Sequence, residues 1–379
     1  MRMKAAVLPG VRQPFSVEEV ELDPPGVGEL LVRMVATGVC HSDVHIYTGD
    51  NVNRPFPIVL GHEGAGIVES VGEGVSEVEA GDHVVMTFLP SCGRCRWCHV
   101  GRPYMCDLGA LLRTGKMLDG TSRLHRLGGN GASDLSNLLF VSTWAEYSVV
   151  PQASVVKVPK DVPLERVCLL GCGFTTGFGA ATNAVHIRPG ETVTIVGCGG
   201  LGLSAVMGAR ISNAGKIIAV DLHEEKLALA KKFGATHTIR NNHDPEAVVA
   251  EIMDITWGVG TDYSFEFVGY DRTHETWAIA FYGVRKGGTM IVCGVGSQDV
   301  EEVPIEPREL VNYRRTMQGV LFGDAQFRTD IPRYVDLYRE GRLDLDGLVT
   351  HEFRLEDINT CVENVLAENR VGRQVIRFD

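Results

Sequence analysis

The chain has 379 residues, of which 44% are hydrophobic and 22% are charged, and its formal net charge is −12. This composition predicts a folded globular protein, and its length favours two domains at ~100–200 residues each. The acidic balance opposes binding to the phosphate backbone of nucleic acids and to anionic membrane surfaces, so we expect neither partner.

Membrane insertion and secretion are not indicated either. No apolar run approaches the ~20 residues that a transmembrane helix needs. The short run Ala5–Pro9 falls far short of the apolar core of a signal peptide. We therefore expect a cytoplasmic protein, in which ten clustered cysteines indicate metal ligands and not disulfides.

The first third of the chain has the pattern of short strands joined by tight turns. Strands are predicted at Lys4–Leu8, Leu30–Thr37 and Gly64–Val71, with glycine and proline recurring between them. This part is predicted to be mainly β.

Residues 38–45, with the sequence Gly-Val-Cys-His-Ser-Asp-Val-His, gather several reactive groups. Cys40 can bind a divalent metal, the hydroxyl of Ser42 can contact a substrate oxygen, and His45 can pass a proton outward. A surface turn is the alternative interpretation of this cluster taken alone. His62, followed by Glu63, is a second candidate metal ligand or, alternatively, a partly buried structural histidine.

A four-cysteine motif with the spacing C-x2-C-x2-C-x7-C comes next. Its members are Cys92, Cys95, Cys98 and Cys106. Four thiolates on one loop can enclose zinc in a tetrahedron with no open position, as in a structural site. An iron–sulfur cluster would require a ferredoxin spacing or a fourth cysteine elsewhere. The arginines at 94, 96 and 102 either offset the negative charge of the thiolates or are ordinary surface residues.

Residues 107–140 are polar and aperiodic, which predicts a long functional loop. Strands are predicted at Ala145–Val150 and Val155–Val158. Cys172 then precedes a helix of small residues, either as a buried structural cysteine or as a metal ligand that acts with Cys40 and His62.

From Glu191 the pattern changes to alternating strands and helices. A strand at Thr192–Val196 ends in Gly197-Cys198-Gly199-Gly200-Leu201-Gly202, a helix follows, and a second strand ends in Asp221. This is the full context of the dinucleotide-binding fingerprint, in which the pyrophosphate rests on the helix N-terminus and the acidic residue accepts from the ribose hydroxyls. The motif predicts an NAD site.

Further strands at Asp262–Val268, Thr289–Val292 and Met317–Leu321 predict a doubly wound parallel sheet. Two helices at 330–339 and 355–368, and a final strand at 374–378, have no place in that sheet. We expect them to rejoin the first domain.

Taken in this order, the motifs resemble the zinc-dependent medium-chain alcohol dehydrogenases over essentially the whole chain, which has the length of their class I or class III members. The resemblance implies an α/β protein with a mainly β, GroES-like catalytic domain, formed by residues 1–173 and 322–379. It implies a Rossmann NAD-binding domain at residues 174–321.

The resemblance also assigns roles to the candidate residues. It implies two zinc ions per chain, a structural one in the four-cysteine loop and a catalytic one at Cys40, His62 and Cys172, with Glu63 just behind it. It further implies that Asp43 orients His62 and that Ser42 and His45 form a proton relay. The residues that resemble cofactor contacts, besides the glycine loop and Asp221, are His41, Thr176, Lys226, Val295 and Arg373.

Each of these has a plainer alternative: Arg373 and Lys226 could be solvated charges, and Thr176 a helix cap. His41 departs from the family pattern, because many members carry an arginine there. The positions that resemble a substrate pocket are Phe88, Leu138, Leu139, Trp144, Val295 and Leu321, with ordinary core as the alternative. They imply a hydrophobic primary alcohol or its aldehyde as substrate.

Three alternatives to a simple NAD-dependent enzyme stay open. Two are a formaldehyde dehydrogenase that acts on thiol adducts and a nicotinoprotein that never releases its NAD. The third is a non-catalytic zinc and dinucleotide binding protein. Such a protein should lack a catalytic zinc ligand, but Cys40, His62 and Cys172 are all present. We expect a homodimer, with a homotetramer as the alternative.

Overall fold

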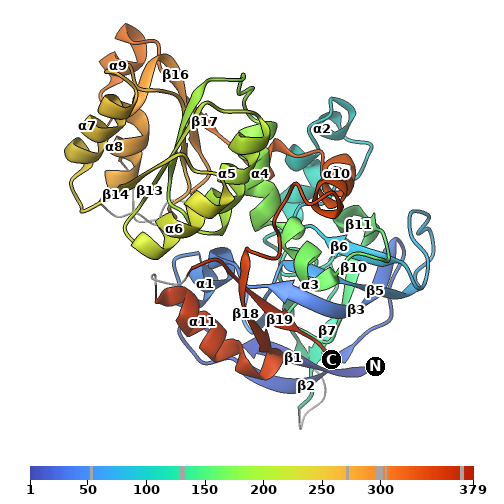
Figure 1. Ribbon diagram of the computed structural model, residues 1–379. Coiled ribbons are helices and arrows are strands. Elements are labelled where there is room, and N and C mark those ends of the chain that lie inside the picture. Colours follow the sequence, from blue (N-terminus) through green and yellow to red (C-terminus); the bar gives the residue numbers. More distant parts are fainter. Residues whose placement is uncertain (52–53, 129–132, 270–272, 295–301, 304, 368–370) are drawn as a thin grey trace. The chain divides into compact units, whose positions relative to one another are not determined.

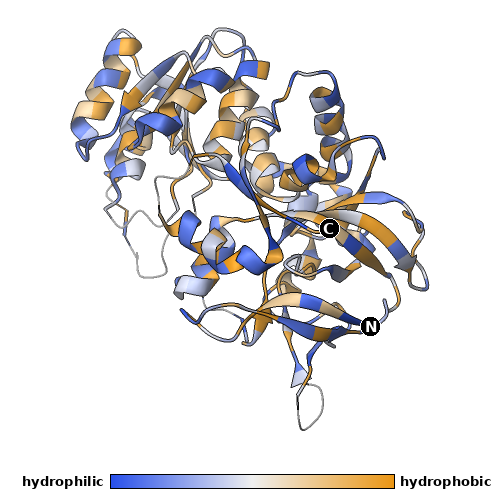
Figure 2. Ribbon diagram, turned by 60° about the horizontal axis from the view of Figure 1, so that its bottom comes forward, coloured by the Kyte–Doolittle hydropathy of each residue, from blue (hydrophilic) through white to orange (hydrophobic). Residues whose placement is uncertain are grey.

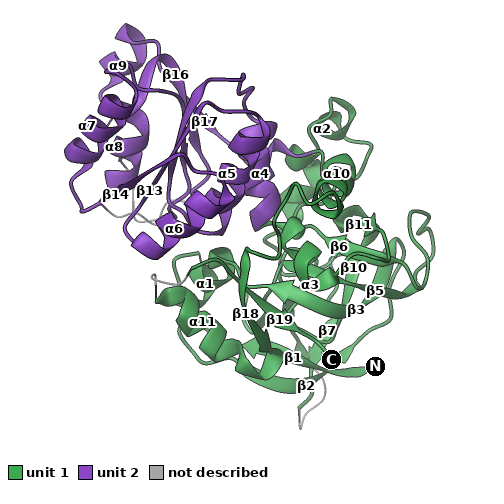
Figure 3. Cartoon of the chain, viewed as in Figure 1, with its two compact units in different colours: residues 1–172, 326–379 green, residues 173–325 purple. Residues whose placement is uncertain are grey.

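A computed structural model describes the chain except residues 52–53, 129–132, 270–272, 295–301, 304 and 368–370 (Figure 1). The chain divides into two compact units, which are shown in Figure 3. Unit 1 comprises residues 1–172 and 326–379, and unit 2 comprises residues 173–325. No helix in the described parts of the chain is long and apolar enough to cross a membrane.

Unit 1 is built mainly from two sheets. The first has the strand order β8-β7-β2-β1-β4-β9 and consists of β1 (Arg2–Leu8), β2 (Ser16–Leu22), β4 (Ile58–Val59), β7 (Leu124–Arg126), β8 (Ser133–Asp134) and β9 (Ser136–Asn137). The second has the order β11-β6-β5-β3-β19-β18, with β10 paired to β3. Its strands are β3 (Glu29–Gly38), β5 (Glu63–Val71), β6 (His83–Met86), β10 (Tyr147–Pro151), β11 (Val155–Val158), β18 (Val349–Arg354) and β19 (Arg373–Arg377).

The helices of unit 1 are short or lie near its C-terminal segment. They are α1 (His41–Thr48), α2 (Arg96–His99), α3 (Leu164–Val167), α10 (Phe327–Arg339) and α11 (Ile358–Leu366). The helix predicted at 355–368 is shorter than expected, because residues 355–357 form a 3₁₀ turn before α11 begins. The final strand, β19, pairs antiparallel with β3 in the register Ile376 to Thr37.

The prediction of a long loop at 107–140 is wrong in part. Residues 107–111 form a 3₁₀ helix, and the segment also contains β7, β8 and β9. These strands have only two or three residues each, so alternation cannot be recognised in them. Their partners are also distant in sequence, since β7 pairs with β2 and β9 pairs with β4.

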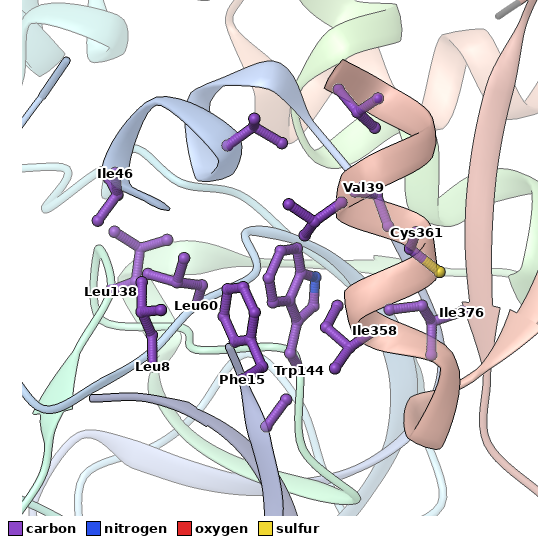
Figure 4. Packing of buried hydrophobic residues seen from close by; sticks show 14 of the residues in the cluster. Leu8, Phe15, Val39, Ile46, Leu60, Leu138, Trp144, Ile358, Cys361 and Ile376 are labelled. Atoms are coloured by element: carbon purple, nitrogen blue, oxygen red, sulfur yellow. The ribbon is translucent and has the colours of Figure 1, made fainter. Parts of the chain in front are cut away.

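A buried cluster beneath α1 and α11 fixes the position of α1 (Figure 4). The inner face of α11 places Ile358, Cys361, Val362 and Val365 at helical spacing toward this cluster. Trp144 lies in the same cluster, with its ring edge-on to that of Phe15 and no exposed surface. Strands and helices both carry hydrophobic and hydrophilic residues (Figure 2).

Unit 2 is a parallel sheet with the order β14-β13-β12-β15-β16-β17, which confirms the predicted doubly wound fold. Its strands are β12 (Thr192–Val196), β13 (Lys216–Asp221), β14 (His237–Arg240), β15 (Thr261–Glu266), β16 (Val284–Val292) and β17 (Thr316–Gly319). Its helices are α4 (Gly173–Thr182), α5 (Gly200–Ile211), α6 (Glu224–Phe233), α7 (Pro245–Ile255), α8 (Glu275–Tyr282) and α9 (Pro307–Asn312).

Two glycines of the loop between β12 and α5 serve different purposes. A Cβ atom added at Gly202 would lie 1.8 Å from the carbonyl oxygen of Gly197, so only glycine lets the helix approach the strand this closely. A Cβ atom added at Gly199 would meet nothing within 4 Å. The close packing of α5 on the sheet therefore depends on Gly202, and Gly199 leaves open space above the loop.

We expect Gly202→Ala to lower the thermal unfolding temperature of the cofactor-free protein clearly, because backbone atoms must shift to relieve the clash. Gly199→Ala is the matched control and should unfold within a few degrees of the parent protein. Equal unfolding temperatures for Gly202→Ala and the parent, measured by calorimetry, would contradict this account of the glycine loop.

Candidate active site

Cys40 is held at the junction between β3 and α1. β3 ends at Gly38 and α1 begins at His41, so Cys40 is the N-cap residue of the helix. Its backbone N–H donates to Asp43 Oδ2 at 3.3 Å. A Cβ atom added at Gly38 would lie 2.1 Å from Oε2 of Glu63, its partner on β5. The close approach of these two strands brings Cys40 near the segment that contains His62.

Asp43 fixes the orientation of His62. The distance from Asp43 Oδ1 to His62 Nδ1 is 3.0 Å, and the same oxygen accepts the Gly61 N–H at 3.0 Å. Asp43 has no exposed surface and His62 is 2% exposed. With Nδ1 of His62 engaged, Nε2 is the ring nitrogen left to bind a metal, as in a carboxylate–histidine–zinc arrangement.

Cys172 completes the cluster. It follows a buried 3₁₀ helix at Cys168–Gly171, in which a Cβ atom on Gly171 would lie 2.2 Å from the carbonyl oxygen of Met86. One ligand atom from each of Cys40, His62, Glu63 and Cys172 lies within 4.8 Å of the others, and all four residues are buried. Two thiolates and one imidazole, converging in this way, fit a catalytic zinc that keeps a position open for substrate.

The electrostatics of the cluster suit a cation. The pKa of Cys40 lies well below its ordinary value because of a hydrogen bond with Cys172 and the nearby His62. The hydrogen bond with Cys40 and burial together raise the pKa of the Cys172 thiol well above its usual range. Burial disfavours protonation of His62, but Asp43 and Cys40 outweigh it and raise the pKa of His62. A bound zinc ion would balance the negative charge of the two cysteine sulfurs, beside the imidazole that Asp43 holds.

Glu63 is paired with Arg373 on β19. The guanidinium of Arg373 donates to the Glu63 carboxylate, and both side chains are buried. Burial raises the pKa of Glu63, whereas the charge of Arg373 opposes that rise. Arg373 is therefore not the solvated charge of the plainer interpretation, because it pairs with a buried carboxylate that lies among the potential metal ligands. A contact of Arg373 with the cofactor pyrophosphate stays a prediction.

The predicted relay residues lie along α1. His41 and Ser42 are exposed within unit 1, and His45 is half-buried, with Nδ1 3.7 Å from Asp50 Oδ2. Burial and the nearby His41 lower the pKa of His45 to about 4, against the opposing effects of Asp50 and Cys40. His45 is therefore neutral near pH 7 and can accept a proton.

The four cysteines of the C-x2-C-x2-C-x7-C motif also converge, and their sulfurs all lie within 4.8 Å of one another. Sulfur–sulfur distances are 3.6 Å for Cys95 to Cys98, 3.9 Å for Cys95 to Cys106 and 4.0 Å for Cys92 to Cys98. Sulfurs placed at ~2.3 Å from zinc in a tetrahedron are about 3.8 Å apart. The loop is therefore spaced for a closed structural zinc site. All ten cysteines are free thiols.

In unit 2, Asp221 is anchored at the tip of β13, beside the glycine loop. Its Oδ2 accepts the Cys198 N–H at 2.8 Å and its Oδ1 accepts the His223 N–H at 3.0 Å. Lys226 is half-buried on α6, and Thr176 is buried on α4. The predicted contact Val295 lies outside the described residues.

The predicted pocket residues have different environments. The ring of Phe88 lies edge-on to the His62 ring, with 5.9 Å between centroids, so this residue borders the metal ligands. Leu138 and Trp144 are fully buried in the cluster of Figure 4, which agrees with the alternative that they are ordinary core residues. Leu139 is half-buried against the same cluster, and Leu321 of unit 2 is 45% exposed.

One half-buried charged residue of unit 1, Arg54, was not predicted from the sequence. It stands alone in the segment before β4 and belongs to no motif, so no sequence signal could have identified it. Its position is informative because Asp43, which orients His62, is one of the charges that act on it.

Known proteins match both units. Residues 26–160 match the alcohol dehydrogenase GroES-like domain family, and residues 200–340 match the zinc-binding dehydrogenase family. The NDMA-dependent alcohol dehydrogenase of Amycolatopsis methanolica is 42% identical over 359 residues, which cover 95% of this chain and 94% of that protein. The S-(hydroxymethyl)glutathione dehydrogenase of Aspergillus oryzae is 41% identical over 367 residues, 96% of this chain and 93% of that protein.

Solved structures give the same result. The crystal structure of benzyl alcohol dehydrogenase from Acinetobacter calcoaceticus has a TM-score of 0.91 at 31% identity and covers 100% of both chains. An alcohol dehydrogenase zinc-binding domain protein from Burkholderia ambifaria has a TM-score of 0.92 at 36% identity, with 100% of this chain and 99% of that chain covered. The predicted combination of a GroES-like and a Rossmann fold is confirmed.

Because the two metal sites are separate, we expect a cysteine substitution to have a different effect in each of them. Cys95→Ser should lower folded yield and thermal stability, since it opens a closed site that contributes folding free energy. Cys172→Ser should leave the fold largely intact and abolish dehydrogenase activity. Elemental analysis beside calorimetry should find one zinc fewer in each variant. A single zinc per chain in freshly purified, fully active parent protein would contradict the two-site description.

The anchored carboxylate of Asp221 predicts a preference for NAD over NADP. An acidic group there accepts from the free ribose diol and repels a 2′-phosphate. Asp221→Ser should reduce the ratio of kcat/KM for NAD to that for NADP, and Asp221→Glu, which keeps the charge, should retain most of it. Equal kcat/KM for both cofactors in the parent would show that Asp221 does not face the ribose.

Proposed function

Because the chain belongs to the zinc-dependent medium-chain alcohol dehydrogenases, we propose that it oxidises a hydrophobic primary alcohol, or reduces the matching aldehyde, by hydride transfer with NAD. The observation that carries the proposal is the buried convergence of Cys40, His62 and Cys172, with Asp43 bound to the outer nitrogen of His62. A non-catalytic binding protein would have no need of a complete catalytic ligand set.

Zinc bound by Cys40, His62 and Cys172 would supply a Lewis acid that polarises the oxygen of the alcohol or aldehyde. The protein residues around it hold and shield the site. Asp43 keeps the ring of His62 in one orientation and one tautomer. Arg373 balances the charge of Glu63, whose carboxylate lies beside the three proposed ligands.

The proton released in alcohol oxidation leaves by a separate route in this proposal. Ser42 receives it from the substrate oxygen, and His45, neutral near pH 7, accepts it toward solvent. The N-terminus of α5 holds the cofactor pyrophosphate, and Asp221 holds its ribose. His41, Thr176, Lys226 and Arg373 are proposed as further cofactor contacts.

The second candidate function is that of a nicotinoprotein whose NAD stays bound, and the 42% identity to an NDMA-dependent alcohol dehydrogenase favours it. The third is oxidation of a formaldehyde–thiol adduct, which the S-(hydroxymethyl)glutathione dehydrogenase relative supports. All three functions use the same zinc site, so the cofactor and the substrate distinguish them.

A panel of substrates and acceptors separates these functions. The purified protein is assayed for retained NAD and tested with primary alcohols plus free NAD, with alcohols plus NDMA, and with formaldehyde plus glutathione. Turnover of primary alcohols with free NAD supports the first function. Retained NAD with turnover only in the presence of NDMA supports the second, and strict thiol dependence supports the third. No turnover under any condition by zinc-replete protein would overturn the proposal.

We also propose that the protein is a cytoplasmic homodimer, in keeping with the family expectation. Light scattering of the purified protein tests the oligomeric state, and a tetramer or monomer would correct it. Cell fractionation tests the location.

If Ser42 and His45 form the proton relay, Ser42→Ala and His45→Gln should lower kcat to different extents and with different pH dependence. Ser42→Ala removes the hydroxyl proposed to touch the substrate oxygen and should lower kcat by ~10²-fold. His45→Gln should cost less, because water can partly replace the imidazole. Its loss should be greatest at low pH, where hydroxide is scarce but His45, with a pKa of about 4, still accepts protons.

Imidazole buffer should restore part of the activity of His45→Gln and leave Ser42→Ala unchanged. The measurement is kcat from pH 5 to 9 with and without imidazole. A profile for His45→Gln that overlays the parent, without rescue, would leave His45 as a structural histidine.

A further inference from the structure

Residues 138–144 form a turn with an unusual backbone. Leu139, Phe140 and Ser142 have φ angles of 55°, 66° and 38°, which place three non-glycine residues in the left-handed region. Bulky residues rarely adopt this conformation, and such strain persists only where the surrounding structure enforces it. Phe140 and Ser142 are also buried, so the turn is held by the interior of unit 1.

Ser142 closes this turn through its side chain. Its hydroxyl accepts the Leu138 N–H at 2.8 Å and donates to the Val59 carbonyl, also at 2.8 Å. Val59 is the last residue of β4, and the chain continues from it to the metal ligand His62 three residues later. The turn is therefore bonded to the segment that leads into the metal site.

Two backbone hydrogen bonds continue this contact. The Trp144 N–H donates to the Leu60 carbonyl and the Thr143 N–H donates to the Gly61 carbonyl, both at 3.0 Å. The side chains of Leu60 and Trp144 also lie together in the buried cluster of Figure 4. With the bond from Ser142, each carbonyl at positions 59–61 accepts a hydrogen bond from the turn.

The side chain of Thr143 lies beside the two glycines that flank His62 and Glu63. A Cβ atom added at Gly61 would lie 2.6 Å from Thr143 Oγ1, and one added at Gly64 would lie 2.5 Å from Thr143 Cγ2. Thr143 has no exposed surface. Its side chain therefore packs against the backbone on both sides of the metal ligand.

The hydroxyl of Thr143 joins this segment to β3. It lies 2.6 Å from the hydroxyl of Thr37, which is also fully buried and donates to the Gly38 carbonyl at 3.3 Å. Because the one proton of the Thr37 hydroxyl is used on Gly38, Thr143 is the donor within the pair. Cys40 comes two residues after Gly38, so the pair connects the strand that leads to Cys40 with the segment that carries His62.

We infer that Thr143 is a positioning residue of the catalytic metal site, whose hydrogen bond to Thr37 holds the backbone of His62 in place relative to Cys40. The inference rests on the proposed function, in which His62 and Cys40 bind zinc, and adds a residue outside the ligand set. Asp43 orients the ring of His62, whereas the two threonines fix the segment that carries it. Replacing a residue that orients metal ligands typically lowers metal affinity by about tenfold to a hundredfold.

The test uses Thr143→Val, which keeps the shape of the side chain but removes the hydroxyl, and Thr143→Ser, which keeps the hydroxyl. Thr37→Val removes the same hydrogen bond from its other end. The matched control is Thr194→Val in unit 2, outside the unit that contains the proposed zinc ligands. Thr194 is fully buried, and its hydroxyl lies 3.2 Å from that of Thr261, which donates to the Gly283 carbonyl at 3.4 Å. This pair therefore has the same chemistry as the pair of Thr143 and Thr37.

Each zinc-replete protein is incubated with the chelator pyridine-2,6-dicarboxylate, and its zinc content is followed by elemental analysis. Thr143→Val and Thr37→Val should each lose one of two zinc ions about tenfold to a hundredfold faster than the parent. X-ray absorption should show that the zinc left behind is bound by sulfur alone. The double variant should lose zinc no faster than either single variant, because all three lack the same hydrogen bond.

Thr143→Ser should release zinc at close to the parent rate, because it keeps the donor. Thr194→Val should also release zinc as the parent does, even if its unfolding temperature falls as far as that of Thr143→Val. This comparison separates an effect on the metal site from a general loss of stability.

Release from Thr143→Val at the rate of Thr194→Val would overturn the inference. Equally fast release from Thr143→Ser and Thr143→Val would also overturn it, since the hydroxyl would then have no part in holding the metal. In both cases, two zinc ions and alcohol turnover in the parent would leave the proposed function intact. A parent that holds only one zinc, bound by four sulfurs, would contradict both. Thr37→Val decides the case in which Thr143→Val does not fold.

Discussion

The hydrogen bonds of Asp43 hold the reaction centre together. Its carboxylate accepts from the backbone of Cys40 and Gly61 and contacts Nδ1 of His62, so a single buried group fixes one metal ligand and the backbone of another. These ligands come from segments about twenty residues apart, and Cys172 comes from far along the chain. The side chain that aligns them cannot be replaced by solvent, because Asp43 has no exposed surface.

The balance of buried charge is the second constraint on this unit. Glu63 lies among the ligand atoms and would repel the thiolates, but Arg373 pairs with it from β19, a strand contributed by the last residues of the chain. The C-terminal segment therefore completes the electrostatics of a site whose ligands are all earlier in sequence. Arg54 differs, since its buried Nε and Nη1 atoms have no hydrogen-bond partner in the described residues.

Local motifs predicted most of the site, because the spacing of the residues in each motif determines which ligand they can bind together. The four cysteines lie within a fifteen-residue loop, and the glycine loop lies between a strand and a helix, so each can be read from neighbouring residues. The role of Cys172 came only from family resemblance, since a lone cysteine before a helix has no distinctive pattern. Five of the six strands of unit 2 were predicted from short runs of β-branched and apolar residues, apart from their ends, but the four-residue strand β14 was not.

What the sequence did not reveal depends on contacts between distant segments. The strands β7, β8 and β9 are too short to show alternation and exist only because distant strands pair with them. The pairing of Arg373 with Glu63 joins residues 310 positions apart. The isolation of Arg54 is a property of its surroundings, and no residue pattern near it indicates that its donors lack acceptors.

The central claim is that this fold presents two different zinc ligand sets, one of four sulfurs and one of two sulfurs with a histidine nitrogen. X-ray absorption spectroscopy of the zinc-replete protein tests it directly. In the parent protein we expect a mixed first shell, with sulfur at ~2.3 Å and nitrogen or oxygen at ~2.0–2.1 Å from zinc. In Cys172→Ser, where only the Cys92–Cys106 loop is occupied, the first shell should contain sulfur alone. An all-sulfur shell in the parent, or a shell of oxygen and nitrogen alone, would contradict it.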